Sequence, residues 1–156
     1  MNAGIQAAEA QFIHFNNSGD RLLFVPDNLV PHRMNFFAVD VVSMAGDAMT
    51  RSPSNRKYLM PHHQGTFIPR SIYLKQFFNE KFHLAADLDF YLRTQASCDV
   101  RHEIVVSRFF IGGASTLSVN RWRRFCERCV IIFNNQYFLP YLRYLLQKPF
   151  CRRRKN

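Results

Sequence analysis

Two carboxylates, Asp87 and Asp89, stand on either side of Leu88 where the sequence predicts the start of a helix. The free backbone N–H groups and the positive dipole end of a helix N-terminus keep a carboxylate at that place ionised. An ionised carboxylate could serve as a general base, which takes a proton from a reacting hydroxyl. It could equally cap the helix, and spacing alone leaves both interpretations of Asp87 open.

A second carboxylate, Asp20, ends the polar turn formed by residues 16–20. Residues 1–10 have a helix-like composition, and the short apolar stretch 11–15 that follows is typical of a buried strand. In open α/β sheets, ligands lie beyond the carboxyl ends of the strands, which is where this turn would place Asp20. An ordinary turn of Ser, Gly and Asp has the same sequence, so a purely structural role is the alternative.

The elements that would position these carboxylates alternate between strand-like and helix-like stretches. Strands are predicted for residues 36–43, 65–68 and 103–109, and helices after Pro69, from Ala85 onward and, capped by Asp27, over 25–30. This alternation indicates an α/β fold. A chain of 156 residues, 47% apolar and 15% aromatic, is large enough to bury one core.

The charge balance favours an anionic partner, because the formal net charge is +10. Four cysteines without a signal peptide are typical of a reducing, cytoplasmic setting. No run of 18 apolar residues is present, so no membrane-spanning helix is predicted.

Most of the positive charge lies in residues 121–156, which carry ten Lys or Arg side chains and one Glu. Aromatic and aliphatic residues stand between these charges, a pattern typical of helices that lie on an anionic membrane face. The same pattern fits an RNA-binding surface. It also fits a helical cap on the sheet with a solvated basic tail, so three interpretations remain open.

Other clusters of reactive residues lack the surroundings that their chemistry needs. Cys126 and Cys129 form a C-x-x-C pair, yet no second pair at zinc spacing accompanies them, and a packed helix face is predicted for both. His62 and His63 are not framed by an HExxH-like motif. The sequence contains neither a P-loop nor a G-x-G-x-x-G motif.

Six short segments, in order, resemble motifs of glycosyltransferase family 2, which has the GT-A fold, and within it the colanic acid and related exopolysaccharide transferases. Each motif is short, and their order and spacing over residues 1–116 carry the resemblance. The segments are residues 1–5 (MNAGI), 15–20 (FNNSGD), 46–48 (GDA), 61–67 (PHHQGTF), 85–89 (AADLD) and 110–116 (FIGGAST).

The resemblance implies an inverting transferase that moves a sugar from a nucleotide-sugar donor to a saccharide or lipid-linked saccharide acceptor. Asp87 matches the general base, and Asp20 matches the turn that binds Mg²⁺ or Mn²⁺. Most of the family carries two acids in that turn, whereas Gly19 stands at the first position here. Donor- or acceptor-binding roles are implied for Asn17, Ser18, His63, Gln64, Asp89, Gly112, Gly113 and Ser115.

The resemblance also divides the chain into two regions. Residues 1–116 match the C-terminal half of a GT-A domain, and residues 117–156 form the basic helical region. The nucleotide-binding half that precedes these motifs in the family has no counterpart in this sequence. We therefore expect a truncated transferase, peripheral to the inner face of the membrane, that needs a complementary N-terminal chain. The alternative is a non-catalytic remnant or interaction protein with a membrane- or RNA-binding tail.

Overall fold

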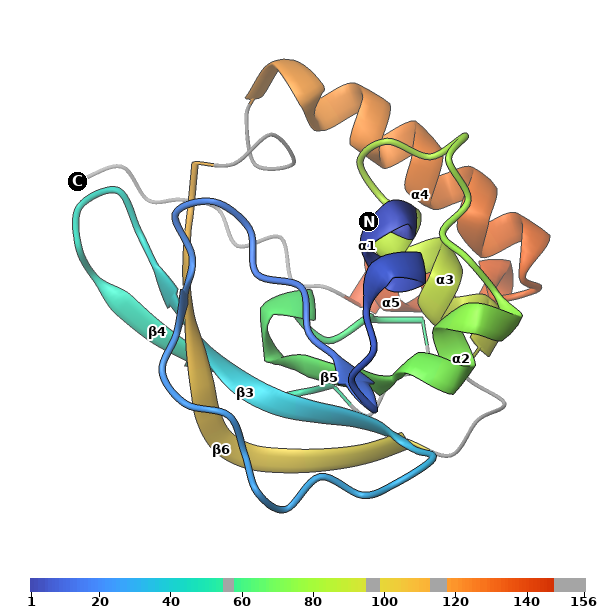
Figure 1. The fold of residues 1–156 in the computed structure, drawn as a ribbon. Coiled ribbons are helices and arrows are strands. Elements are labelled where there is room, and N and C mark those ends of the chain that lie inside the picture. Colours follow the sequence, from blue (N-terminus) through green and yellow to red (C-terminus); the bar gives the residue numbers. More distant parts are fainter. Residues whose placement is uncertain (55–57, 95–98, 113–117, 148–156) are drawn as a thin grey trace.

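The computed structural model describes residues 1–54, 58–94, 99–112 and 118–147 (Figure 1). Its helices are α1 (Asn2–Ala7), α2 (Arg70–Lys75), α3 (Ala86–Thr94), α4 (Arg121–Asn134) and α5 (Phe138–Gln147), with short 3-10 turns η1 (His63–Gly65) and η2 (Ser118–Asn120). Its strands are β1 (Phe12–Ile13), β2 (Arg21–Leu22), β3 (Met34–Val42), β4 (Ala48–Arg51), β5 (Thr66–Pro69) and β6 (Asp99–Phe110). The fold is therefore mixed α/β, as the sequence predicts.

The strands form one mixed sheet with β3 at its centre. The strand order is β1-β5-β3-β6-β2, and β4 extends the sheet by pairing with the second half of β3. Strands β3 and β6 run parallel, whereas the other pairs are antiparallel. Figure 1 shows a curved sheet with the helices gathered on one side of it.

Strand β3 is buried on both faces, which is typical of a central strand. Because side chains alternate along a strand, Met34 and Phe36 point into the main core beneath the helices. Phe37 points to the other face, where it packs with Phe67 and Val106. Helices α4 and α5 contribute to the main core through Ile131, Ile132 and Tyr141.

The turn η1 lies against the backbone of β3, and Gly65 makes this approach possible. A Cβ atom at Gly65 would stand 2.5 Å from the Phe37 carbonyl oxygen and 2.8 Å from Cγ1 of Val39. No side chain larger than hydrogen fits there without displacing the strand. The contact fixes the two residues before it, His63 and Gln64, beside the sheet.

Several local predictions are wrong. Residues 25–30 contain no helix, so Asp27 caps none. The resemblance implies a strand for residues 46–48, whereas Gly46 and Asp47 lie in the turn between β3 and β4 and only Ala48 is in β4. Cys126 is exposed and Cys129 half-buried, so a packed face does not hold both.

Within the described residues, no helix is long and apolar enough to cross a membrane.

Candidate functional site

A groove of about 860 Å³ lies between the sheet and helices α3 and α4. Six separate stretches of the chain line it: Met1, the turn before β2, the segment leading into η1, the start of α3, the end of β6 and one face of α4. Its polar lining includes Asn17, Ser18, Asp20, His62, His63, Gln64, His83, Asp87, Arg121, Arg124 and Arg128. Six of the residues that the resemblance selects therefore meet in one place.

Asp20 is held at the carboxyl end of β6. The backbone N–H of Phe110, the last residue of that strand, donates to Oδ1 of Asp20 at 3.1 Å. The buried Gln64 side chain donates from Nε2 to Oδ2 at 2.9 Å. The predicted turn is present, since the Asp20 N–H donates to the Asn17 carbonyl at 3.0 Å. Asp20 thus combines its turn with a place in the groove.

His63 joins the turn before β2 to the start of α3. The Asn17 amide nitrogen lies 2.8 Å from Nε2 of His63, and Nδ1 of His63 lies 3.6 Å from Oδ2 of Asp87. Because an amide NH₂ group is a donor, Nε2 accepts from it. The neutral ring then carries its proton on Nδ1, facing Asp87. Three candidate residues from three segments are therefore in direct contact.

Glu127 holds the backbone segment that leads into helix α3. Its carboxylate reaches across from α4 and accepts backbone N–H bonds from His83, Leu84 and Ala85 at 3.3, 2.8 and 3.1 Å. Burial alone would raise the pKa of Glu127, but these donors and Arg123 outweigh burial and lower it. Asp87 is the second residue of α3, and its own carboxylate accepts the N–H of Leu88 in the first turn of that helix.

The two oxygens of Asp87 have separate surroundings. Oδ1 accepts from the Leu88 N–H at 2.8 Å, whereas Oδ2 faces His63. The side chain is 35% exposed, so its carboxylate is accessible from the groove. Asp87 therefore accepts an N–H of the first helical turn through Oδ1 and presents Oδ2 to the groove, a geometry compatible with both the capping and the general-base interpretation.

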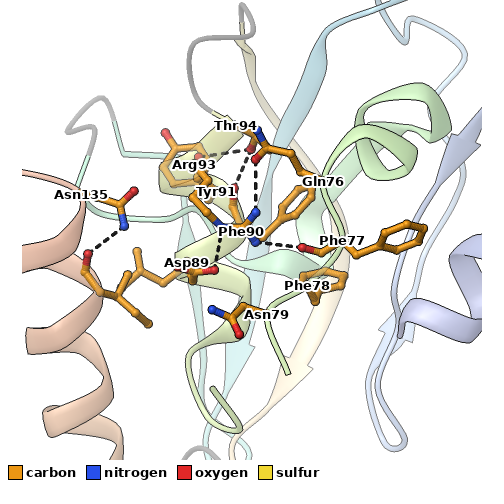
Figure 2. A network of polar contacts seen from close by, with 12 residues as sticks. Gln76, Phe77, Phe78, Asn79, Asp89, Phe90, Tyr91, Arg93, Thr94 and Asn135 are labelled. Atoms are coloured by element: carbon orange, nitrogen blue, oxygen red, sulfur yellow. Dashed lines mark hydrogen bonds and ion pairs between the residues drawn. The ribbon is translucent and has the colours of Figure 1, made fainter. Parts of the chain in front are cut away.

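Asp89 does not line the groove. It is buried on α3 and pairs with Arg93, whose Nε lies 2.8 Å from Oδ2 of Asp89. Figure 2 shows Arg93 between Asp89 and the loop after α2, where it also donates to Gln76 and to the Phe77 carbonyl at 3.3 and 2.9 Å. Asp89 therefore ties that loop to α3.

The glycine-rich segment is described only in part. Gly112 is exposed, has φ of 146° and does not line the groove, although Phe109 and Phe110 just before it do. Gly113 and Ser115, which the resemblance also selects, lie outside the described residues.

Sequence reasoning missed the arginines of the groove. Arg121, Arg124 and Arg128 are spaced by three and four residues, so they share one face of α4, and that face lines the groove. The 3-4 spacing was a usable signal, but the surrounding basic residues obscured it.

No protein-family model, curated protein or solved structure matches this chain. The resemblance to glycosyltransferase family 2 therefore rests on the six sequence motifs. Among the residues that the structure describes, no three His, Cys, Asp or Glu side chains converge as metal ligands.

Proposed function

We propose that the groove is the acceptor and diphosphate side of an inverting, nucleotide-sugar-dependent glycosyltransferase with a GT-A fold, acting in exopolysaccharide synthesis. The observation that carries the proposal is the contact of Asn17, His63 and Asp87, which come from three distant segments and which the motifs select independently. A mixed α/β sheet with Asp20 at a strand's carboxyl end is compatible with it.

In the proposed reaction, Asp87 accepts the proton of the attacking acceptor hydroxyl. His63 orients this carboxylate from one side, and the Leu88 N–H holds its other oxygen. Asn17 in turn fixes the orientation and tautomer of the His63 ring. A base positioned in this way typically contributes about 10²- to 10⁴-fold to the rate.

Asp20 fits the role of a carboxylate ligand for Mg²⁺ or Mn²⁺. Its two oxygens offer about four acceptor positions, and the hydrogen bonds from Gln64 and the Phe110 N–H occupy one position on each oxygen. Mg²⁺ commonly takes one or two carboxylates and completes its shell with water and substrate phosphates. When bound, the ion would neutralise charge on the leaving diphosphate.

We further propose that a complementary nucleotide-binding half supplies the contacts to the donor base and ribose. Transfer requires the donor to be fixed in line with the acceptor, and such positioning contributes several kcal/mol, about 7 to 11 in favourable cases. We expect residues 1–156 by themselves to bind phosphate-bearing ligands and to show no detectable turnover.

A saturation-transfer nuclear magnetic resonance experiment tests the proposal directly. The chain is mixed with Mg²⁺ and a panel of UDP- and GDP-sugars, and saturation is transferred from its methyl groups to the ligands. We expect signals from the sugar protons that are retained in Asp87→Asn, because the base is not required for donor binding. Absence of transfer to every nucleotide-sugar would remove the assignment.

A second candidate function, attachment to a membrane surface, is favoured by the outer face of α4 and α5. Phe133, Leu139 and Leu146 are 68, 66 and 77% exposed, and the two helices also carry the exposed basic side chains of Arg123 and Arg143. Apolar side chains of this kind insert at a membrane interface while basic side chains attract anionic lipid.

Co-sedimentation with anionic and neutral liposomes, run beside an RNA gel shift, tests this attachment. The double variant Leu139→Ser/Leu146→Ser should lose binding to anionic liposomes. Met44→Ser, which removes an apolar residue 89% exposed on the distant β3–β4 turn, should bind like the parent protein. An RNA shift without liposome binding would show that the basic region serves RNA instead.

A further inference from the structure

Two arginines of the groove have no carboxylate partner. Arg124 and Arg128 are half-buried on α4, and neither forms an ion pair within the part of the chain that the structure describes. Their neighbour Arg123, by contrast, is paired with Glu127 at 3.2 Å. A half-buried guanidinium that lacks an internal counter-ion is available to an external anion.

These arginines lie beside the start of α3. Glu127 stands between them in the sequence, and its carboxylate binds the backbone of residues 83–85, just before Asp87. Helix α4 therefore holds the Glu127 carboxylate toward the segment before α3, and it holds the guanidinium groups of Arg124 and Arg128 toward the groove. The arginines are thus tied to the part of the groove that contains Asp87.

The carboxylates of the groove compensate for only part of this positive charge, because Asp20 and Asp87 stand against three arginines and the described ion pairs join neither to a guanidinium. Asp20 is occupied by Gln64 and the Phe110 N–H, and Asp87 faces His63 and the Leu88 N–H. Arg121 adds a third guanidinium to the same face, one turn earlier on α4. Guanidinium groups match phosphate oxygens in pairs of hydrogen bonds, which makes a phosphate the anion that this face fits best.

We propose that Arg121, Arg124 and Arg128, here called the arginine face, form a phosphate-binding site beside Asp87. The identification of its ligand rests on the proposed function: a phosphate next to the general base belongs to the acceptor, so the acceptor is a phosphorylated or diphosphate-linked saccharide. The donor diphosphate offers the same chemistry and is the other possible source.

Calorimetry with inorganic pyrophosphate, without metal, tests the site. The double variant Arg124→Gln/Arg128→Gln should weaken binding by about tenfold or more, since a hydrogen bond between charged groups contributes more than a neutral one. The matched control is Arg143→Gln on α5, which removes an exposed charge outside the groove and should bind pyrophosphate like the parent. Thermal unfolding followed by circular dichroism establishes that each variant is folded. If the glutamine double variant does not fold, Arg124→Lys/Arg128→Lys replaces it, because lysine keeps the charge and loses the paired hydrogen bonds.

Two further ligands separate the sources of the phosphate. If Arg124→Gln/Arg128→Gln loses binding of geranyl diphosphate but still binds UDP in the presence of Mg²⁺, the site belongs to the acceptor. If the variant loses UDP and still binds geranyl diphosphate, the site belongs to the donor. Pyrophosphate binding without any nucleotide-sugar binding would leave the arginine face standing while removing the transferase proposal. Unchanged pyrophosphate affinity in the double variant, or an equal loss in Arg143→Gln, would overturn the site, because a diffuse basic surface behaves in that way.

Discussion

The Glu127 carboxylate on helix α4 accepts the backbone N–H of Leu84 at 2.8 Å, so one helix holds the start of another. The same carboxylate also receives the N–H groups of His83 and Ala85. These bonds fix the backbone just before Asp87 and leave the Asp87 side chain free to face the groove. The position of the candidate base therefore depends on a residue 40 positions later in the sequence.

Glu127→Ala should lower the free energy of unfolding by about 1 to 3 kcal/mol, because three backbone N–H donors, of which that of Ala85 belongs to a buried residue, would lose a charged acceptor. Urea denaturation measures the change, and Glu9→Ala, which removes an exposed carboxylate from the segment after α1, is the control. Because the pKa of Glu127 is lowered in the folded protein, its contribution is present above its usual value of 4.5 and is lost as the pH falls through the lowered pKa. Equal stability of the two variants at neutral pH would contradict the proposed contribution of Glu127 to holding the backbone before α3.

Gly65→Ala should destabilise the fold by about 1 to 3 kcal/mol, as overpacking typically does. The added Cβ would stand 2.5 Å from the Phe37 carbonyl oxygen, and the obstacle is backbone that cannot rotate away. Gly4→Ala is the matched control, because nothing lies within 4 Å of that Cβ in helix α1. Thermal unfolding should show a loss for the first variant and no loss for the second. A Gly65→Ala protein as stable as the parent would mean that η1 does not lie against β3.

Two histidines make stability fall in mild acid. His14 stacks on Phe67 and His102 on Phe37, with ring centroids 4.6 and 4.2 Å apart, and each ring has a buried Nε2 without a partner among the described residues. Burial lowers the pKa of both rings from the usual 6.5.

The unfolded chain therefore binds more protons than the folded one as the pH drops below 6.5, and stability falls with it. Urea midpoints at neutral and mildly acidic pH measure this slope. His14→Gln/His102→Phe should have a shallower slope than the parent, and an unchanged slope would assign the pH dependence to other groups.

Asp87→Asn should abolish sugar transfer when the chain is combined with its proposed nucleotide-binding half. An amide cannot accept the proton of the acceptor hydroxyl, so turnover should fall by about 10²- to 10⁴-fold. Donor binding should persist. Turnover within a few-fold of the parent would show that Asp87 is not the base.

Local patterns were sufficient to predict much of this fold. Strands β3, β5 and β6 and the helix that begins near Ala85 were predicted from their sequences. The signals are runs of apolar residues and the turn residues that flank them, which depend on only a few neighbouring positions. The helix predicted over residues 25–30 was wrong, because a capping residue favours a helix only where the following residues can bury an apolar face.

The candidate site was predicted only in part, because local sequence patterns do not show which distant segments come together. Turn and strand patterns, together with the motifs, selected Asp20, His63 and Asp87. These patterns do not predict which of the selected side chains contact one another. The bond from Glu127 to Leu84 joins residues that no local pattern connects. The arginine face was likewise hidden, since its role depends on how α4 packs across the groove.

The most direct test of the proposed function is calorimetry of UDP and GDP binding with and without Mn²⁺. We predict that Mn²⁺ strengthens binding in the parent protein and that this Mn²⁺-dependent gain is reduced by about tenfold or more in Asp20→Ala, because the carboxylate ligand is gone. Asp27→Ala, which removes an exposed carboxylate from the loop before β3, should bind like the parent. Affinity that is unchanged in Asp20→Ala, or no nucleotide binding in the presence of Mn²⁺, would contradict the assignment of this groove to nucleotide-sugar chemistry.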